Sequence, residues 1–141
     1  FRYVLIGGAG NTLGLVLLMC KSKSKHIRSI GRLSVLPGIC GINEPIIFGM
    51  PIVLNPIMAI PFVIANITMA IVTYASTYIG LVPVSIGVEV PWTTPPIISG
   101  LLIGGWRVAL WQFVMIVVSF VIYLPFIKKI DTLELNKENQ K

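Results

Sequence analysis

The sequence predicts an all-α membrane protein, built from transmembrane helices and one re-entrant hairpin. Of its 141 residues, 55% are hydrophobic, and the mean hydropathy of +0.90 is well above that of a soluble globular domain. The 95 residues from 33 to 127 contain only three charged side chains, those of Glu44, Glu89 and Arg107. A soluble protein could not cover its surface with so few charges, so the main solvent of this chain is lipid.

Three apolar stretches are long enough to cross about 30 Å of hydrocarbon as helices. They run over about residues 3–20, 50–79 and 97–127, and the last is interrupted at Gly104 and Gly105. The part of the third stretch after this interruption is long enough to cross by itself. We therefore expect three transmembrane spans.

The segment 33–49, LSVLPGICGINEPIIFG, is apolar but contains two prolines and three glycines, so a re-entrant hairpin is expected in place of a continuous helix. Irregular backbone at membrane depth is tolerated only where protein or a water-filled cavity satisfies its N–H and C=O groups. The hairpin tip is therefore expected in a polar site. A second irregular segment, 80–96, has four prolines and two glycines and is predicted to be a loop that dips toward that site.

The basic residues lie mainly at the ends of these stretches. The segment 21–32, KSKSKHIRSIGR, is too charged to enter the bilayer and is interpreted as a cytoplasmic loop or a short interfacial helix, with a partner-protein docking site as the alternative. Lys128 and Lys129 mark the inside end of the last span. Residues 131–141 predict a short, mobile polar tail on the cytoplasmic side.

Composition also excludes several other kinds of site. The net charge of +6 lies in loops and has no interleaved aromatic pattern, so no nucleic-acid partner is expected. His26 is the only histidine, and Cys20 and Cys40 have no partner at metal-ligand spacing. We predict neither a metal nor a cofactor.

Glu44 is the strongest candidate functional residue, because an ionisable side chain inside an apolar, helix-breaking segment is costly to bury and is usually functional. Its carboxylate can accept hydrogen bonds from the hydroxyls of a sugar, and Asn43 can donate and accept beside it. The structural alternative is a carboxylate that only caps the N-terminus of a half-helix.

Three further positions have two interpretations each. Trp92, in VPWTTPP, can stack against the apolar face of a sugar ring or anchor the chain at the membrane interface. Asn11 lies in a glycine-rich part of the first span, where it lines a cavity or serves helix packing. Glu89 pairs with Arg107 or lies in water.

Two runs of residues resemble a known family. GICGINEPIIFGMPIVLNPIMAIPF, residues 38–62, and VPWTTPPIISGLL, residues 90–102, are similar to the membrane-embedded IIC component of the bacterial phosphoenolpyruvate-dependent sugar phosphotransferase system, in its lactose/cellobiose/diacetylchitobiose branch. The resemblance covers nearly the whole chain, and GINEPIIFG with the downstream PWTTPP is specific to that branch.

The resemblance implies a homodimeric, multi-pass sugar permease of the bacterial cell membrane. Residues 1–130 would be the C-terminal substrate-binding domain, which holds a disaccharide such as cellobiose, lactose or chitobiose while a phosphorylated IIB protein donates the phosphoryl group. Glu44 would bind the sugar near the hydroxyl to be phosphorylated and is a candidate base. Asn43 would lie beside it, and Trp92 would be the aromatic residue of the site. We add Asn11 as a further substrate-binding candidate.

Two parts of the family's pattern find no match in this chain, namely the N-terminal dimerising domain and a histidine on a first hairpin. His26 lies in the basic segment and does not match that histidine. We therefore expect one wall of a sugar site here. The alternatives are a secondary transporter or channel that uses Glu44 for ion or proton coupling, an inactive truncated permease, and a membrane scaffold or sensor.

Overall fold

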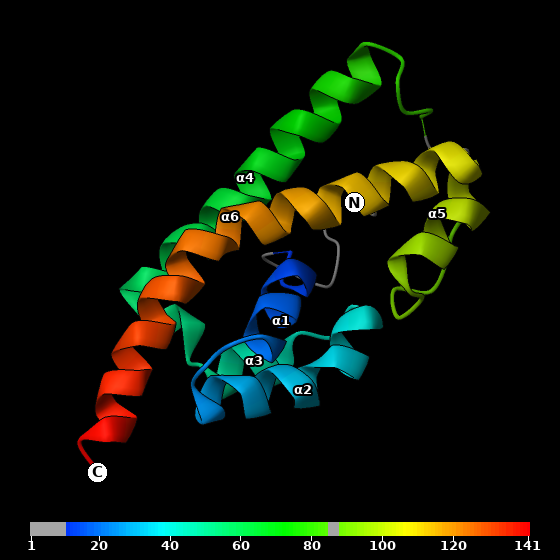
Figure 1. Ribbon diagram of the computed structural model, residues 1–141. Helices are drawn as coiled ribbons and strands as arrows, with labels where there is room; N and C mark the ends of the chain where they lie inside the picture. Colours follow the sequence, from blue (N-terminus) through cyan, green and yellow to red (C-terminus); the bar gives the residue numbers. More distant parts are fainter. Residues whose placement is uncertain (1–10, 85–87) are drawn as a thin grey trace.

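The computed structural model describes residues 11–84 and 88–141, and this part of the chain is helical without strands. The helices in chain order are α1 (Leu13–Cys20), α2 (Lys25–Ile39), α3 (Glu44–Gly49), the short 3₁₀ helix η1 (Ile52–Leu54), α4 (Pro56–Tyr78), α5 (Pro96–Gly104) and α6 (Trp106–Asn139). Figure 1 shows two long helices, α4 and α6, with the short helices α1, α2 and α3 grouped beside the C-terminal half of α6. The predicted all-α fold is confirmed.

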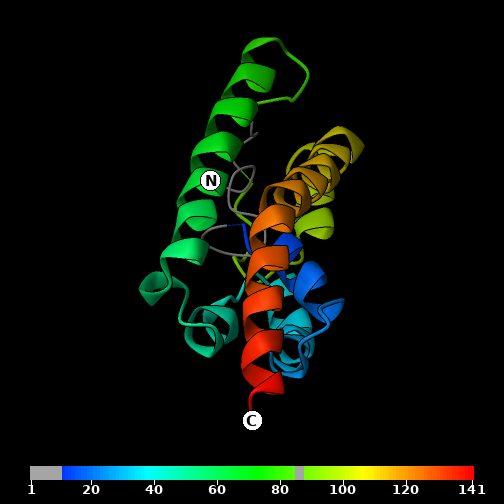
Figure 2. The ribbon, with the colours of Figure 1, turned by 60° about the vertical axis from the view of Figure 1, so that its left-hand side comes forward.

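Helices α4 and α6 are the two described helices that are long and apolar enough to cross a membrane. In each, only 28% of the residues in the most apolar stretch are buried inside the molecule, so the rest of that stretch needs lipid or further protein as its surroundings. Figure 2 shows them as two long columns that extend away from the hairpin region. Much of the first expected span, residues 3–10, lies outside the described residues, and its described end forms α1.

One face of α6 forms the core against which other helices pack. Its buried residues recur every three or four positions, as a single helical face requires: Val108, Gln112, Met115, Ser119, Tyr123, Ile127 and Ile130. Helices α1, α4 and α5 all pack on α6, and α2 packs on α1. The spanning helix is thus the common support of the shorter elements.

Glycines allow the closest of these helix contacts. A Cβ atom added to Gly14 of α1 would lie 2.5 Å from the backbone N of Phe120 in α6. A Cβ atom on Gly31 of α2 would lie 2.9 Å from the backbone N of Cys20 in α1. Both contacts bring one helix backbone against another, so no side chain fits between them.

The hairpin extends over a longer range than the expected residues 33–49. Its first arm, α2, already begins at Lys25 inside the basic segment and passes through Pro37, so the prolines and glycines do not break it before residue 39. The break instead lies at residues 40–43, and α3 is the second arm. The helix in the expected span 50–79 is shorter than predicted, because η1 precedes it and α4 begins only at Pro56.

The C-terminal end differs from the expected mobile tail. Helix α6 continues without interruption to Asn139, and residue 130 is no element boundary. The reason is local pairing: Lys137 and Glu134 form an ion pair at 2.8 Å, and Asp131 and Glu138 accept hydrogen bonds from residues 22–26. The break in the third stretch is present as predicted, because α5 ends at Gly104 and α6 begins at Trp106.

Gly31→Ala should destabilise the complete permease, because the added methyl group meets the backbone of α1. Overpacking of this kind costs about 1–3 kcal/mol. Gly38→Ala is the matched control on the same helix, since its Cβ would come no closer than 3.4 Å to Val16 Cγ2. Thermal unfolding in detergent should show a lower midpoint for Gly31→Ala alone, and equal midpoints for the two variants would contradict the close approach.

Candidate functional site

The turn between the two arms of the hairpin is a Schellman motif. After α2 ends, Gly41 N–H donates to the Gly38 carbonyl at 3.1 Å and Ile42 N–H donates to the Pro37 carbonyl at 2.9 Å. Gly41 has φ +81°, a left-handed conformation that glycine adopts without strain. This motif satisfies the free carbonyls of α2 and reverses the chain at a single residue. The hairpin tip therefore follows directly from the sequence PGICG.

Asn43 and Glu44 come immediately after this turn, at the start of α3. Asn43 is 6% exposed, and its carbonyl accepts hydrogen bonds from Ile46 N–H at 3.1 Å and Ile47 N–H at 3.0 Å. Glu44 is the first residue of α3, and its side chain is exposed. Asn43 is thus buried at the start of α3, while Glu44 is exposed and available to a ligand.

Trp92 lies in the described end of the second irregular segment, residues 88–95. Thr94 N–H donates to the Pro91 carbonyl at 3.0 Å, which makes a tight turn around Trp92, and α5 begins two residues later at Pro96. The indole is 64% exposed. The segment therefore presents an aromatic side chain from a short, constrained loop.

The two irregular segments meet. A Cβ atom on Gly41 would lie 3.2 Å from the backbone carbonyl oxygen of Trp92, so the hairpin turn lies directly against the tryptophan loop. In Figure 1 the turn after α2 faces the loop that precedes α5. Glu44 follows this contact by three residues on one side, and Trp92 is part of it on the other. The turn that precedes Asn43 and Glu44 thus lies against the loop that carries Trp92, about fifty positions later in the chain.

Helix α5 holds the tryptophan loop on α6. Gln112 of α6 donates through Nε2 to Ser99 Oγ at 3.3 Å, and Ser99 Oγ donates to the Pro96 carbonyl at 2.7 Å. A Cβ atom on Gly100 would lie 2.9 Å from Ala109 Cα, so the α5 and α6 backbones also touch. The loop is fixed relative to the same helix that supports the hairpin through α1.

Asn11 lies elsewhere, at a junction between α4 and α6. It is fully buried with φ +52°, a conformation that asparagine tolerates better than most residues. Its Nδ2 donates to Asn66 Oδ1 of α4 at 3.1 Å, and its carbonyl accepts a hydrogen bond from Ser119 Oγ of α6. These partners favour the helix-packing interpretation, and the sugar-binding role of Asn11 stays a prediction.

Glu89 and Arg107 are both exposed, and the ion pair that the structure gives within the described ranges joins Glu134 and Lys137 instead. Sequence reasoning missed the contacts of Asp131 and Glu138 with residues 22–26. The donors in these contacts are serine hydroxyls and backbone N–H groups, which no local pattern of the sequence marks as partners of α6.

Asn43, Glu44 and Trp92 have side chains of the kinds that polyol recognition uses. A carboxylate accepts hydrogen bonds from hydroxyls, an amide donates and accepts, and an indole face covers the apolar C–H face of a pyranose ring. Small-molecule sites usually combine a small number of polar groups with an apolar or aromatic surface. The two segments that meet at the Gly41–Trp92 contact carry side chains of these kinds.

Comparison with known proteins shows which family the chain resembles. The family model described as "Phosphotransferase system, EIIC" matches residues 1–66. The chain is 47% identical over 140 residues to the lichenan permease IIC component of Bacillus subtilis (strain 168), and the match covers 97% of the chain and 31% of that protein. It is 44% identical to the cellobiose-specific EIIC component of Geobacillus stearothermophilus, covering 88% of the chain and 28% of that protein.

The fold has a solved counterpart. The crystal structure of the transporter ChbC, the IIC component from the N,N'-diacetylchitobiose-specific phosphotransferase system, matches with a TM-score of 0.95 and 42% identity. The match covers 98% of this chain and 33% of that one, so the chain spans about a third of the length of the relatives it matches. The chain therefore belongs to the EIIC family of the phosphotransferase system and corresponds to its C-terminal part.

Proposed function

We propose that this chain is the sugar-binding part of an EIIC permease, which carries a β-linked disaccharide across the bacterial plasma membrane for phosphorylation by a IIB protein. The observation that supports the proposal most directly is the contact between Gly41 and the Trp92 carbonyl, which joins the hairpin turn to the tryptophan loop. Relatives named for lichenan, cellobiose and lactose support a β-linked glycoside as the substrate.

In this proposal each side chain has a separate task. The Trp92 indole covers one face of a pyranose ring and excludes water from it. Asn43 and Glu44 bind hydroxyls at the ring edge, and Glu44 accepts a hydrogen bond from the hydroxyl that becomes phosphorylated. As that oxygen forms its bond to the phosphorus carried by IIB, the bond between phosphorus and IIB breaks and its electron pair stays with IIB. The carboxylate of Glu44 is placed to take up the proton that the hydroxyl loses.

The membrane placement follows from the same elements. Helices α4 and α6 cross the bilayer, and the hairpin formed by α2 and α3 enters from the cytoplasmic side, where Lys128 and Lys129 end the apolar part of α6. The part of the family outside this chain supplies the dimer contact and the rest of the sugar site. The complete protein is thus a multi-pass homodimer.

Gly41→Ala should weaken sugar binding by the complete permease, because alanine is strained at φ +81° and its methyl group would press on the Trp92 carbonyl. The conformational strain alone costs about 1–2 kcal/mol. Gly80→Ala is the matched control: Gly80 ends α4 in the same type of turn at φ +84° but has nothing within 4 Å of an added Cβ. Equilibrium binding should fall for Gly41→Ala alone, and an equal loss in both variants would contradict a role of the contact in the site.

Glu44→Gln should lower the affinity for a panel of cellobiose, lactose and N,N'-diacetylchitobiose. A hydrogen bond to a charged acceptor contributes about 1.5–3 kcal/mol, so the dissociation constant of the best sugar should rise at least about tenfold. Glu89→Gln changes the other carboxylate within residues 33–127 and should leave binding intact. Unchanged binding for Glu44→Gln would favour a structural hairpin.

Trp92→Ala should weaken binding of the same sugars by about tenfold, because the ring loses its stacking surface. Trp106→Ala is the control, since Trp106 is 69% exposed and Trp92 is 64% exposed. If both tryptophans only anchor the protein at the interface, both variants will bind sugar like the wild type.

The transport reaction can be tested in vesicles that hold the complete permease. Sugar phosphate should accumulate inside only when phosphorylated IIB is supplied on the cytoplasmic side. Accumulation of free sugar without IIB, driven by a proton gradient, would instead support a secondary transporter that uses Glu44 for coupling.

A further inference from the structure

The end of α6 holds the loop that leads into the hairpin. Beyond Lys128 and Lys129, Asp131 accepts hydrogen bonds from Ser22 Oγ, from Lys23 N–H at 3.1 Å and from Ser24 N–H at 2.9 Å. One carboxylate therefore binds three consecutive residues of the connection between α1 and α2. The connection has no freedom to move without breaking these bonds.

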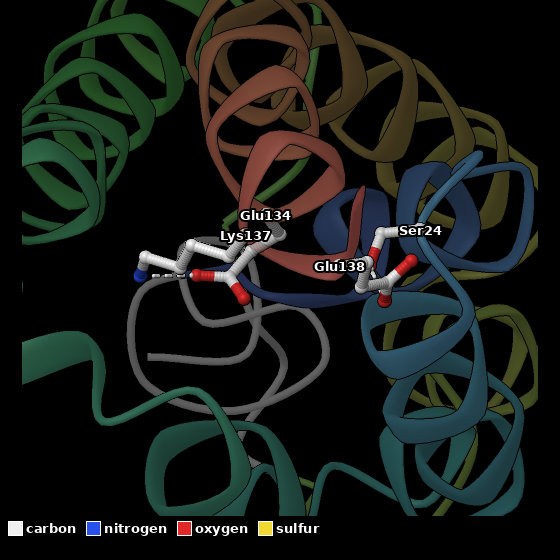
Figure 3. Close-up of polar contacts among 4 residues, drawn as sticks. All are labelled: Ser24, Glu134, Lys137 and Glu138. Atoms are coloured by element: carbon white, nitrogen blue, oxygen red, sulfur yellow. Dashed lines mark hydrogen bonds and ion pairs between the residues drawn. The ribbon is translucent and has the colours of Figure 1, made fainter. Parts of the chain in front are cut away.

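A second carboxylate of α6 caps the hairpin helix itself. Ser24 is the N-cap residue of α2, yet its hydroxyl makes no cap bond within its own helix. Instead Ser24 Oγ donates to Glu138 Oε1 at 2.8 Å, and His26 N–H donates to the same oxygen at 3.2 Å. Figure 3 shows Ser24 pointing to Glu138, while Glu134 and Lys137 pair on another side of α6. The N–H groups of the N-cap Ser24 and of His26 in the first turn of α2 are thus satisfied by another helix.

Both carboxylates are ionised in this arrangement. Asp131 and Glu138 lie outside the apolar part of α6, seven residues apart, which places them two turns apart on one face. Partial burial would raise the pKa of Asp131, but hydrogen bonds from Ser22, Ser24 and Lys23 outweigh it and hold that pKa below its usual value. Hydrogen bonds from Ser24 and His26 lower the pKa of Glu138. Charged acceptors at a helix N-terminus also interact favourably with the helix dipole.

The base of α2 controls the position of its tip. Helix α2 has 15 residues and ends at the turn that carries Asn43 and Glu44. It is therefore a rod of about 22 Å, and a tilt of about 5° at its base would move the tip by about 2 Å. A shift of that size is enough to alter the close approach of the hairpin turn to the Trp92 loop, where an added Cβ at Gly41 would lie 3.2 Å from the Trp92 carbonyl oxygen.

We propose that Asp131 and Glu138 are positioning residues of the sugar site, which cap α2 from α6 and thereby fix the hairpin tip against the Trp92 loop. Neither carboxylate touches the sugar. The inference rests on the proposed function, because it assigns these residues to the same binding site. It predicts that changes at the far end of α6 alter sugar affinity through the tilt of α2.

The test compares two double variants of the complete permease. The first double variant, Asp131→Ala with Glu138→Ala, removes the acceptor oxygens. The second, Asp131→Asn with Glu138→Gln, keeps an acceptor oxygen at each position but removes the charge. Glu134→Gln is the control, since it removes only the ion pair with Lys137. Two quantities are measured: hydrogen exchange of the amides of residues 22–28, and the dissociation constants of cellobiose, lactose and N,N'-diacetylchitobiose.

The alanine pair should speed amide exchange in residues 22–28 and raise the dissociation constant of the best sugar by about tenfold, the scale expected for a displaced binding group. The Asn/Gln pair should lie between it and the wild type, and Glu134→Gln should match the wild type in both measurements. Unchanged exchange in the alanine pair would overturn the capping contact. Faster exchange with unchanged sugar affinity would overturn the positioning role and leave a purely structural cap. A wild-type protein that binds none of the sugars would overturn the proposed function, and this inference with it.

Discussion

Direct contact between helix backbones is the constraint on which the rest of this structure depends. Gly14 brings α1 onto α6, Gly31 brings α2 onto α1, and Gly100 brings α5 onto α6, each without room for a side chain. In an apolar solvent helices gain nothing from the hydrophobic effect by associating, so such close packing is a main source of their affinity. The hairpin packs on α6 through α1, whereas the tryptophan loop is held on α6 by α5. Their relative position is therefore set by α6.

The candidate site lies where regular structure stops. A helix that ends within the protein must satisfy its free carbonyls, and the turn at Gly41 does this through two backbone hydrogen bonds before the chain reverses. The loop that carries Trp92 closes the other side of the contact. Because the backbone is satisfied by its own turn, Glu44 is left exposed at the start of α3, where a polyol can reach it. The two interruptions of regular structure thus lie against each other, with Glu44 in one and Trp92 in the other.

Much of this arrangement could be predicted from the sequence, since it depends on apolar length and on proline and glycine. The fold class, the family and the break at Gly104 and Gly105 follow from such local signals. The extent of α2 did not follow from local signals. Pro37 removes one backbone hydrogen bond, but the helix continues past it to Ile39. The contacts of Asp131 and Glu138 could not be predicted either, because their partners lie more than a hundred residues away in the chain. Without knowledge of those partners, a polar C-terminal segment is interpreted as a tail. The prolines and glycines of residues 80–96 indicated a loop that dips toward the site, but the particular contact of Gly41 with Trp92 is tertiary and no local pattern contains it.

The central claim is that the hairpin turn and the tryptophan loop form one wall of a sugar site. A structure of the complete permease with bound cellobiose, lactose or N,N'-diacetylchitobiose tests it most directly. The account predicts a sugar hydroxyl within hydrogen-bonding distance of the Glu44 carboxylate and a pyranose face against the Trp92 indole. A sugar bound at another position, with both side chains out of contact, would contradict it.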